Sequence, residues 1–129
     1  MEFTIKTLIK ATAKEIYTTW LSSEGHANMT GGSATASDKE GDEYMAWDDY
    51  ITGKNLELIP FKKIVQSWRS TQFEEHEEDS KIEIFLRETD GTTELTLTHT
   101  NIPETGEHYI KGWENHYFLP MKEYFSYKS

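Results

Sequence analysis

The sequence contains no cysteine among its 129 residues, and basic side chains are scarce, with 13 lysines and arginines against 23 aspartates and glutamates. Without cysteine the chain can form no disulfide and no thiolate zinc site, and it has no cysteine nucleophile. The net charge of −10 would repel phosphate backbones and anionic lipid headgroups, so we expect no binding to nucleic acid or to a membrane surface.

Long hydrophobic runs are also missing. Charges interrupt every apolar run in residues 1–17, so we expect no signal peptide and no membrane span, and a cytoplasmic location is the default. Aromatic residues, in contrast, make up 13% of the chain, which indicates a dense core or a lined cavity, because large rings are costly to leave in water. The length suits a single domain, expected over residues 1–129.

The amino-terminal part predicts one strand followed by two short helices. Residues 2–9 alternate apolar and polar side chains with a period of two, as a strand does. Thr12 and Glu15 form a capping-box pattern, in which each side chain satisfies a backbone N–H at a helix start. The serine pair at 22–23 can cap a second short helix, which the glycine pair at 31–32 ends.

The rest of the chain predicts a sheet and a long helix that covers it. From about residue 33 to 101 the pattern is repeatedly two-fold, with turns between the runs and a strong hairpin signal at Asp90-Gly91. Residues 106–127 carry an apolar stripe at helical spacing, and Pro120 is expected to kink this helix. The predicted class is α+β, with a curved antiparallel sheet of about six to seven strands gripping the carboxy-terminal helix.

The inward face of this arrangement holds the candidate binding residues. They are Trp20, Tyr44, Gln66, Trp68, Ile84, Leu97, His99, Trp113, Tyr117 and Met121. One interpretation is that they only fill the core, and the other is that the sheet curves away from the helix and leaves a hydrophobic cavity. Gln66 and His99 are polar at inward positions, so they need a partner, which can be one another, a tyrosine hydroxyl or a ligand.

Signatures of catalysis and of metal binding are missing from the sequence. The five histidines include no pair at the spacing of three or four that helical metal ligands need. No G-x-S-x-G motif, Gly-rich phosphate loop or Walker sequence occurs. We therefore expect no catalytic residues, no metal and no cofactor.

An acidic run at residues 74–79 places five carboxylates in six positions. Like charges repel and stay in water, so the simpler interpretation is a solvated hairpin loop. The alternative is an acidic patch for a basic protein partner, where charge would mainly speed the encounter.

Short segments in a fixed order carry a family resemblance. They are Gly41-Asp42-Glu43-Tyr44, Tyr50-Ile51-Thr52-Gly53, Ile64-Val65-Gln66-Ser67-Trp68-Arg69, Leu95-Thr96-Leu97-Thr98-His99, Ile102-Pro103 and Gly112-Trp113. Over about residues 3–125 the chain resembles the domain family of the activator of heat shock protein 90 ATPase homologue, a branch of the START-like (SRPBCC) helix-grip superfamily. The family turn usually has Gly at the position of Asp49, and Asp also tolerates the left-handed conformation.

The resemblance implies three functions. The first is non-catalytic binding of a small hydrophobic or aromatic ligand between the sheet and the carboxy-terminal helix. The second is a chaperone-associated protein-binding module in the stress response, like a heat shock protein 90 co-chaperone. In eukaryotic co-chaperones such a domain follows a separate amino-terminal domain, whereas this chain begins directly at the first strand. The third is an aromatic polyketide cyclase-type enzyme.

Overall fold

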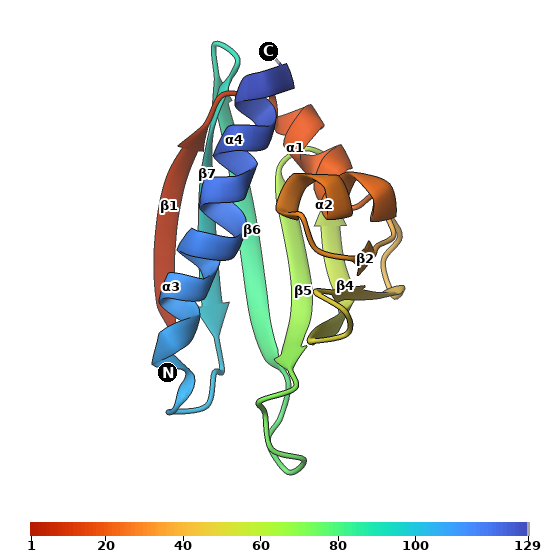
Figure 1. The fold of residues 1–129 in the computed structure, drawn as a ribbon, viewed down its shortest axis with the longest axis vertical. Coiled ribbons are helices and arrows are strands. Elements are labelled where there is room, and N and C mark those ends of the chain that lie inside the picture. Colours follow the sequence, from red (N-terminus) through yellow and green to blue (C-terminus); the bar gives the residue numbers. More distant parts are fainter. Residues whose placement is uncertain (129) are drawn as a thin grey trace.

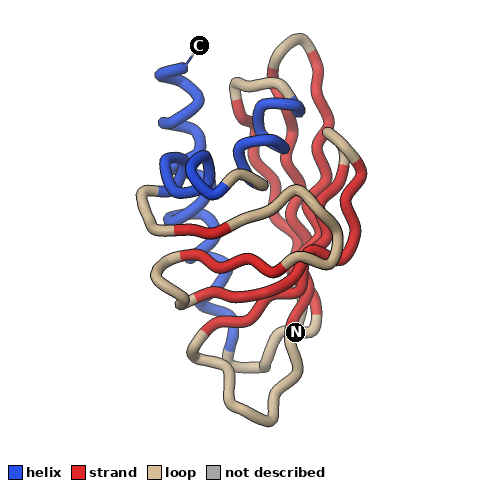
Figure 2. Tube along the Cα trace, turned by 90° about the vertical axis from the view of Figure 1, so that its right-hand side faces the viewer, coloured by secondary structure: helices blue, strands red, loops and turns tan. Residues whose placement is uncertain are grey.

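The computed structural model describes residues 1–128, in which seven antiparallel strands form a curved sheet and the helices lie on one side of it (Figure 2). The strands are β1 Phe3–Ile9, β2 Ala34–Thr35, β3 Glu43–Ala46, β4 Ile51–Ile59, β5 Lys63–Ser70, β6 Ser80–Thr89 and β7 Thr92–Thr100. Their spatial order is β1-β7-β6-β5-β4-β3-β2, so β1 and β2 are the edges. The predicted α+β helix-grip class is confirmed.

The helices cover the concave face in two groups (Figure 1). Helices α1 (Ala13–Trp20) and α2 (Ser23–Thr30) lie over the strands β4 and β5, and a long rod crosses β6 and β7. The rod consists of a 3-10 turn (Gly106–His108), α3 (Tyr109–Trp113), a π-helical segment (Glu114–Phe118) and α4 (Leu119–Lys128).

The short helices begin as the sequence predicts. The hydroxyl of Thr12 accepts a hydrogen bond from the backbone N–H of Glu15 at 3.1 Å, and the Thr12 N–H donates to the Glu15 carboxylate at 3.1 Å. Such a cap contributes about 1 kcal/mol to helix stability. Ser22 caps α2 in the same way, and Gly31 ends it with a φ of 87°, which glycine adopts without strain.

The long helix departs from regular α-helical geometry in the segment directly before Pro120. Proline has no N–H to donate to the carbonyl of His116, and its ring would collide with that carbonyl in a regular α-helix. The structure has a π-helical segment at Glu114–Phe118, whose wider turn lies directly before the proline, and α4 then continues to Lys128. The structure thus has a local change of helix type before Pro120, and the kink itself stays a prediction.

The hairpin of β6 and β7 sets the register of the core. Asp90 and Gly91 both have positive φ, and the pairing places Ile84 opposite Leu97 on the concave face. Both of these side chains are completely buried. Burying a side chain of this size stabilises the fold by about 1.5–3 kcal/mol, which fixes the register because a slip of one residue would expose it.

Candidate functional site

A cleft of about 530 Å³ lies between α3, strand β5 and the turn that joins β3 to β4. It is partly open to solvent. The residues that line it are Trp47, Tyr50, Ile51, Trp68, His108, Tyr109, Lys111, Gly112, Trp113, Asn115, His116 and Tyr117. Its size is that of a site for a small molecule.

Aromatic rings form most of the cleft wall. The ring of Trp68 lies 4.9 Å from that of Tyr109 and 5.8 Å from that of Trp113, measured between centroids. Trp113 also contacts Tyr117, at 4.7 Å. Each of these rings therefore packs against the next, and together they give the cleft a largely apolar wall.

The turn between β3 and β4 brings Trp47 to the cleft at a conformational cost. Trp47, Asp48 and Asp49 have φ values of 56°, 55° and 67°, all in the left-handed region. This region costs a non-glycine residue about 1–2 kcal/mol. The hydroxyl of Ser33 anchors the turn by donating to the Asp48 carboxylate at 2.6 Å. The Trp47 ring lies against Gly32, where a Cβ would come within 2.3 Å of the ring.

Gln72, in the loop after β5, joins three residues of the cleft wall. Its side-chain carbonyl accepts a hydrogen bond from Tyr50 Oη at 2.8 Å and lies 2.8 Å from His108 Nε2. The hydroxyl of Tyr109 lies 3.5 Å from the same oxygen and bonds Ser70. A single amide thus ties the turn, the loop and the start of the long helix together.

Gly112 lines the cleft without a steric reason to be glycine. It lies inside α3, and a Cβ added there would meet no atom within 4 Å. Glycine in a helix interior costs about 1 kcal/mol relative to alanine. The residue therefore lowers helix stability while leaving the cleft wall bare at this point.

Three of the ten predicted binding residues line this cleft: Trp68, Trp113 and Tyr117. The other seven lie elsewhere in the interior. Ile84, Leu97 and Met121 are completely buried in the core, and Tyr44 donates its hydroxyl to the backbone carbonyl of Ser67 at 2.7 Å. A ligand-binding role for these core residues stays a prediction.

Gln66 forms hydrogen bonds with two other buried residues, Trp20 and Asn55. The Trp20 indole N–H donates to Gln66 Oε1 at 3.3 Å, and Gln66 Nε2 donates to Asn55 Oδ1 at 2.8 Å. Asn55 in turn donates to the backbone carbonyls of Ser37 and Lys39. The polar group at position 66 therefore has protein partners and joins α1 to the sheet.

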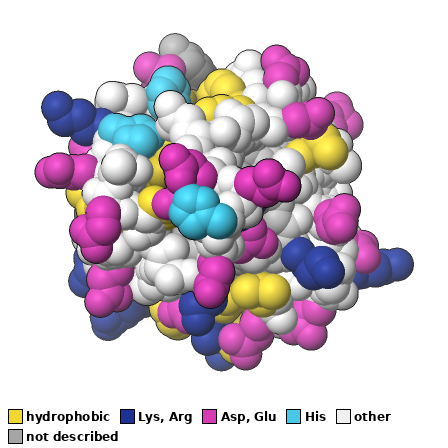
Figure 3. Space-filling model, turned by 90° about the horizontal axis from the view of Figure 1, so that it is seen from below, with side chains coloured by type: hydrophobic (Ala, Val, Ile, Leu, Met, Phe, Trp, Pro, Cys, Tyr) yellow, Lys and Arg dark blue, Asp and Glu magenta, His cyan; other side chains and the backbone are white. Residues whose placement is uncertain are grey.

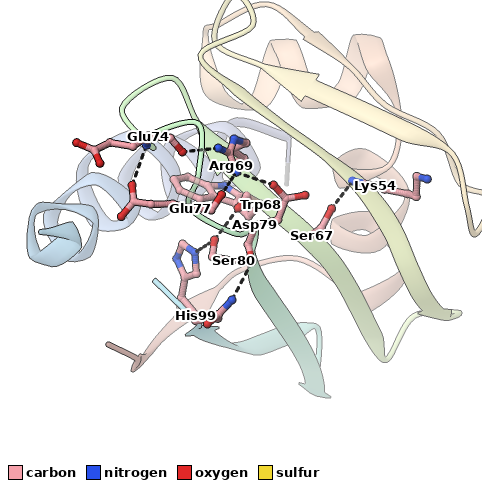
Figure 4. Close-up of polar contacts among 10 residues, drawn as sticks. Lys54, Ser67, Trp68, Arg69, Glu74, Glu77, Asp79, Ser80 and His99 are labelled. Atoms are coloured by element: carbon pink, nitrogen blue, oxygen red, sulfur yellow. Dashed lines mark hydrogen bonds and ion pairs between the residues drawn. The ribbon is translucent and has the colours of Figure 1, made fainter. Parts of the chain in front are cut away.

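His99 lies in a chain of hydrogen bonds that continues through Ser80 to Trp68 (Figure 4). The Trp113 indole N–H donates to His99 Nδ1 at 3.1 Å, so the proton of the neutral ring lies on Nε2, which donates to Ser80 Oγ at 2.8 Å. Ser80 donates to the carbonyl of Trp68 at 2.6 Å. Burial lowers the pKa of His99 to about 3, so the ring is neutral; it accepts from the indole of Trp113 and packs against the ring of Trp68.

Tyr117 is held by a second histidine. The Nδ1–H of His26 donates to the carbonyl of Trp20 at 2.9 Å, which leaves Nε2 to accept from the Tyr117 hydroxyl at 3.1 Å. Burial lowers the pKa of His26 and raises that of Tyr117, so both groups are neutral.

The sequence analysis missed the cleft residues that come from the β3–β4 turn, the start of β4 and the first half of the rod. These are Trp47, Tyr50, Ile51, His108, Tyr109, Lys111, Gly112, Asn115 and His116. Periodicity identifies positions that face the core, but it says little about side chains on a turn. Gly112 was a sequence signal that could have pointed to the cleft, because glycine is unfavourable inside a helix.

The acidic loop at 74–79 is organised by one arginine (Figure 4). Arg69 donates to the backbone carbonyls of Glu77 and Glu74 at 2.6 and 2.7 Å and to the carboxylate of Asp79 at 3.1 Å. The loop lies beyond the ends of β5 and β6, at the end of the molecule where carboxylates are spread across the surface (Figure 3). Across residues 1–128 no three His, Asp or Glu side chains are grouped to hold a metal ion.

A curved antiparallel sheet around a long carboxy-terminal helix, with a cleft at one end of that helix, defines a START-like helix-grip domain. The sequence model of the family described as Activator of Hsp90 ATPase homolog 1-like protein matches residues 10–126. The chain belongs to this family.

Individual relatives agree with this assignment. The human Activator of 90 kDa heat shock protein ATPase homolog 1 is 27% identical over 127 residues, which are 98% of this chain and 37% of that protein. The chain thus spans little more than a third of the length of this curated relative. Among the helices of residues 1–128, none has the length and apolar character to cross a membrane.

Solved structures share the fold. An HSP90 activator from Plasmodium falciparum superposes with a TM-score of 0.79 at 22% identity, covering 92% of this chain and 91% of the other. The Aha1 dimer from Colwellia psychrerythraea gives 0.81 at 19% identity, with 97% and 96% covered. At these identities the likeness concerns the fold alone.

Proposed function

We propose that this chain binds a small hydrophobic or aromatic molecule in the cleft between the sheet and the carboxy-terminal helix, and that it does so without catalysis. The observation that carries this proposal is the cleft of about 530 Å³ with six aromatic rings among its lining residues. A largely apolar wall of aromatic rings favours flat apolar ligands, because stacking adds to the gain from burial.

Two further features support the proposal, because neither is needed for a packed core. The turn at Trp47 holds three consecutive non-glycine residues in the left-handed conformation, and such strain is typical of binding sites. Gly112 leaves the helix bare where it faces the cleft. The turn places the Trp47 ring as a wall of the cleft, and Gly112 leaves room for a bound molecule.

The proposal is tested with a variant whose added side chain fills part of the cleft. A library of small aromatic compounds is screened by thermal shift against the unaltered chain and against Gly112→Leu, whose side chain would occupy the space at that position. We expect compounds that raise the melting temperature of the unaltered chain and lose this effect in Gly112→Leu. Gly112→Ala is the matched control and should keep most of the binding. The proposal is wrong if no compound stabilises the chain or if Gly112→Leu binds as well.

Family membership favours a second function, a chaperone-associated protein-binding module in the cytoplasm. The relatives that match are activators of the heat shock protein 90 ATPase, although the chain spans only part of their length. The ordered acidic loop 74–79 is a surface that a basic partner could meet, and its charge would speed association.

Direct binding to heat shock protein 90 tests this second function. Glu75→Lys with Glu78→Lys reverses charge on the acidic loop and keeps the Arg69 contacts, and Glu2→Lys with Glu123→Lys is the control of equal net charge. We expect salt-sensitive binding that the loop variant weakens by several fold and the control does not. No retention of the chaperone by the unaltered chain would remove this function.

A further inference from the structure

The cleft differs in charge from the rest of the molecule. The chain has 23 acidic residues and a net charge of −10, yet no Asp or Glu is among the residues that line the cleft. The lining instead includes Lys111, His108 and His116. The site is therefore a local exception in a surface that otherwise repels anions.

Three acidic residues next to the cleft in sequence, Asp48, Asp49 and Glu114, are engaged at other places, and Glu114 lines the hollow beside β1. Asp48 follows Trp47 directly, but its carboxylate accepts the hydroxyl of Ser33 at 2.6 Å. Asp49 lines a separate hollow, together with Arg69 and Glu75. Carboxylates are thus kept out of the cleft even where the chain supplies them beside it.

The lysine and the two histidines of the cleft differ in the number of partners that they already have. Both ring nitrogens of His108 have partners, the carbonyl of Thr105 at 3.2 Å and Gln72 at 2.8 Å. His116 stands edge-on to the Trp47 ring at 5.6 Å, and Lys111 is exposed on α3. Lys111 and His116 are therefore the groups that can meet a charged ligand.

Resting on the proposed function, we propose that the cleft selects aromatic molecules that carry one anionic group, such as a carboxylate. The ring of the ligand lies among the tryptophans and tyrosines of the wall, and the anion lies toward Lys111 and His116. A cation in the same place would lose the attraction of Lys111 and meet a like charge. The expected preference is modest, because Lys111 is exposed and a charge pair of this kind changes affinity by about two- to fivefold.

Three ligands that share one ring system separate the charge from the ring. The probes are 2-naphthoate, 2-naphthalenemethanol and 2-naphthylmethylamine, titrated at 0.15 M salt, where charges farther than about 8 Å away are largely screened. The indole N–H signals in ¹H–¹⁵N spectra report the site, because Trp47, Trp68 and Trp113 line the cleft and Trp20 does not. We expect shifts at the three cleft indoles and the tightest binding for naphthoate.

Charge-neutralising variants assign the selectivity to a residue. Lys111→Gln should weaken naphthoate binding by about two- to fivefold and leave naphthalenemethanol unchanged. The matched control is Lys122→Gln, on the same rod but beside a different hollow, and it should change neither. If the alcohol or the amine binds as tightly as naphthoate, or if Lys111→Gln and Lys122→Gln behave alike, the anion preference is wrong while the aromatic site stands. If none of the three probes shifts the cleft indoles, the proposed function fails as well.

Discussion

The two ends of the long carboxy-terminal rod meet the same sheet in different ways. Around α4 the interior is tightly packed, and the buried side chains include Ile9, Leu95, Met121 and Phe125, none exposed by more than 1%, while a smaller hollow lies between the start of α4 and β1. Around α3 the contacts are mostly between aromatic rings, and they surround a cleft of about 530 Å³. Flexible apolar side chains fill space well, whereas the rings at the cleft meet at steep angles, 81° between Trp68 and Tyr109 and 44° between Trp113 and Tyr117.

The change between the two ends falls at the π-helical segment Glu114–Phe118. Within it Tyr117 faces the cleft, while Phe118 lines another hollow beside β1. A π-helical turn widens the helix and shifts the faces that follow, and such segments are frequent at functional sites. One helix can therefore serve as core at one end and as the wall of a site at the other, because its internal geometry changes between them.

The largest expected difference between the ends is in stability. Phe125→Ala removes a buried ring at the tightly packed end and should lower the free energy of unfolding by about 3–5 kcal/mol. Tyr50→Ala, at the half-buried rim of the cleft, should cost about 1–2 kcal/mol, since the space it leaves is open to water. Denaturant unfolding of both variants measures this. Equal losses would mean that the cleft is part of the packed core.

The next effect is a pH dependence that arises at His99. The pKa of His99 is about 3 in the folded chain, against 6.5 for a histidine in water, so between these two pH values only the unfolded chain binds a proton. The stability that the neutral ring provides is complete above about pH 6.5 and falls as the pH falls toward 3. The loss between pH 7 and pH 4 should be about 3 kcal/mol.

His99→Gln isolates this contribution, because glutamine can also accept from Trp113 and donate to Ser80 but does not titrate. We expect the variant to be less stable at pH 7 and to lose less stability on acidification than the unaltered chain. His26, whose pKa burial also lowers, is present in both proteins and cancels in the difference. Parallel stability curves for the two proteins would show that His99 does not cause the dependence.

A smaller effect compares two threonine hydroxyls away from the cleft, on β1 and β7. Thr93 Oγ1 donates to the carbonyl of Ala11 at 2.7 Å, whereas the buried Thr7 Oγ1 has no hydrogen-bond partner among residues 1–128. Thr93→Val should cost about 1–3 kcal/mol, because it leaves a buried carbonyl unpaired. Thr7→Val should be neutral or stabilising. Thermal unfolding distinguishes them, and a loss at Thr7 equal to that at Thr93 would mean that Thr7 has a partner.

The fold was largely predictable from the sequence, and the cleft was only partly so. Alternating strands, the capping box at Thr12 and the Asp90-Gly91 hairpin are local signals, because each depends only on residues that are close together in the sequence. The cleft depends instead on the left-handed turn at Trp47 and on Gln72, whose effect appears only when distant segments meet. Trp68, Trp113 and Tyr117 were predicted because they also follow the periodicity of the core.

Limits of the same kind apply to the polar residues of the inward face. The sequence placed Gln66 and His99 inside and required partners for them, but it could not choose among a tyrosine, a ligand and each other. The partners are Asn55, Ser80 and two tryptophans. Asn55 is only 1% exposed beside a register shift in β4, and no alternation marks such a position.

The smallest effect we expect is a gain in stability at the cleft. Gly112→Ala should raise the free energy of unfolding by about 0.5–1 kcal/mol, because alanine favours the helix and its Cβ meets no atom within 4 Å. Gly53→Ala is the contrast, since its Cβ would lie 2.0 Å from the carbonyl oxygen of Ser67 and should be strongly destabilising. Thermal unfolding compares the two. If Gly112→Ala also destabilises, the glycine is needed for folding, and the cleft no longer explains why it is there.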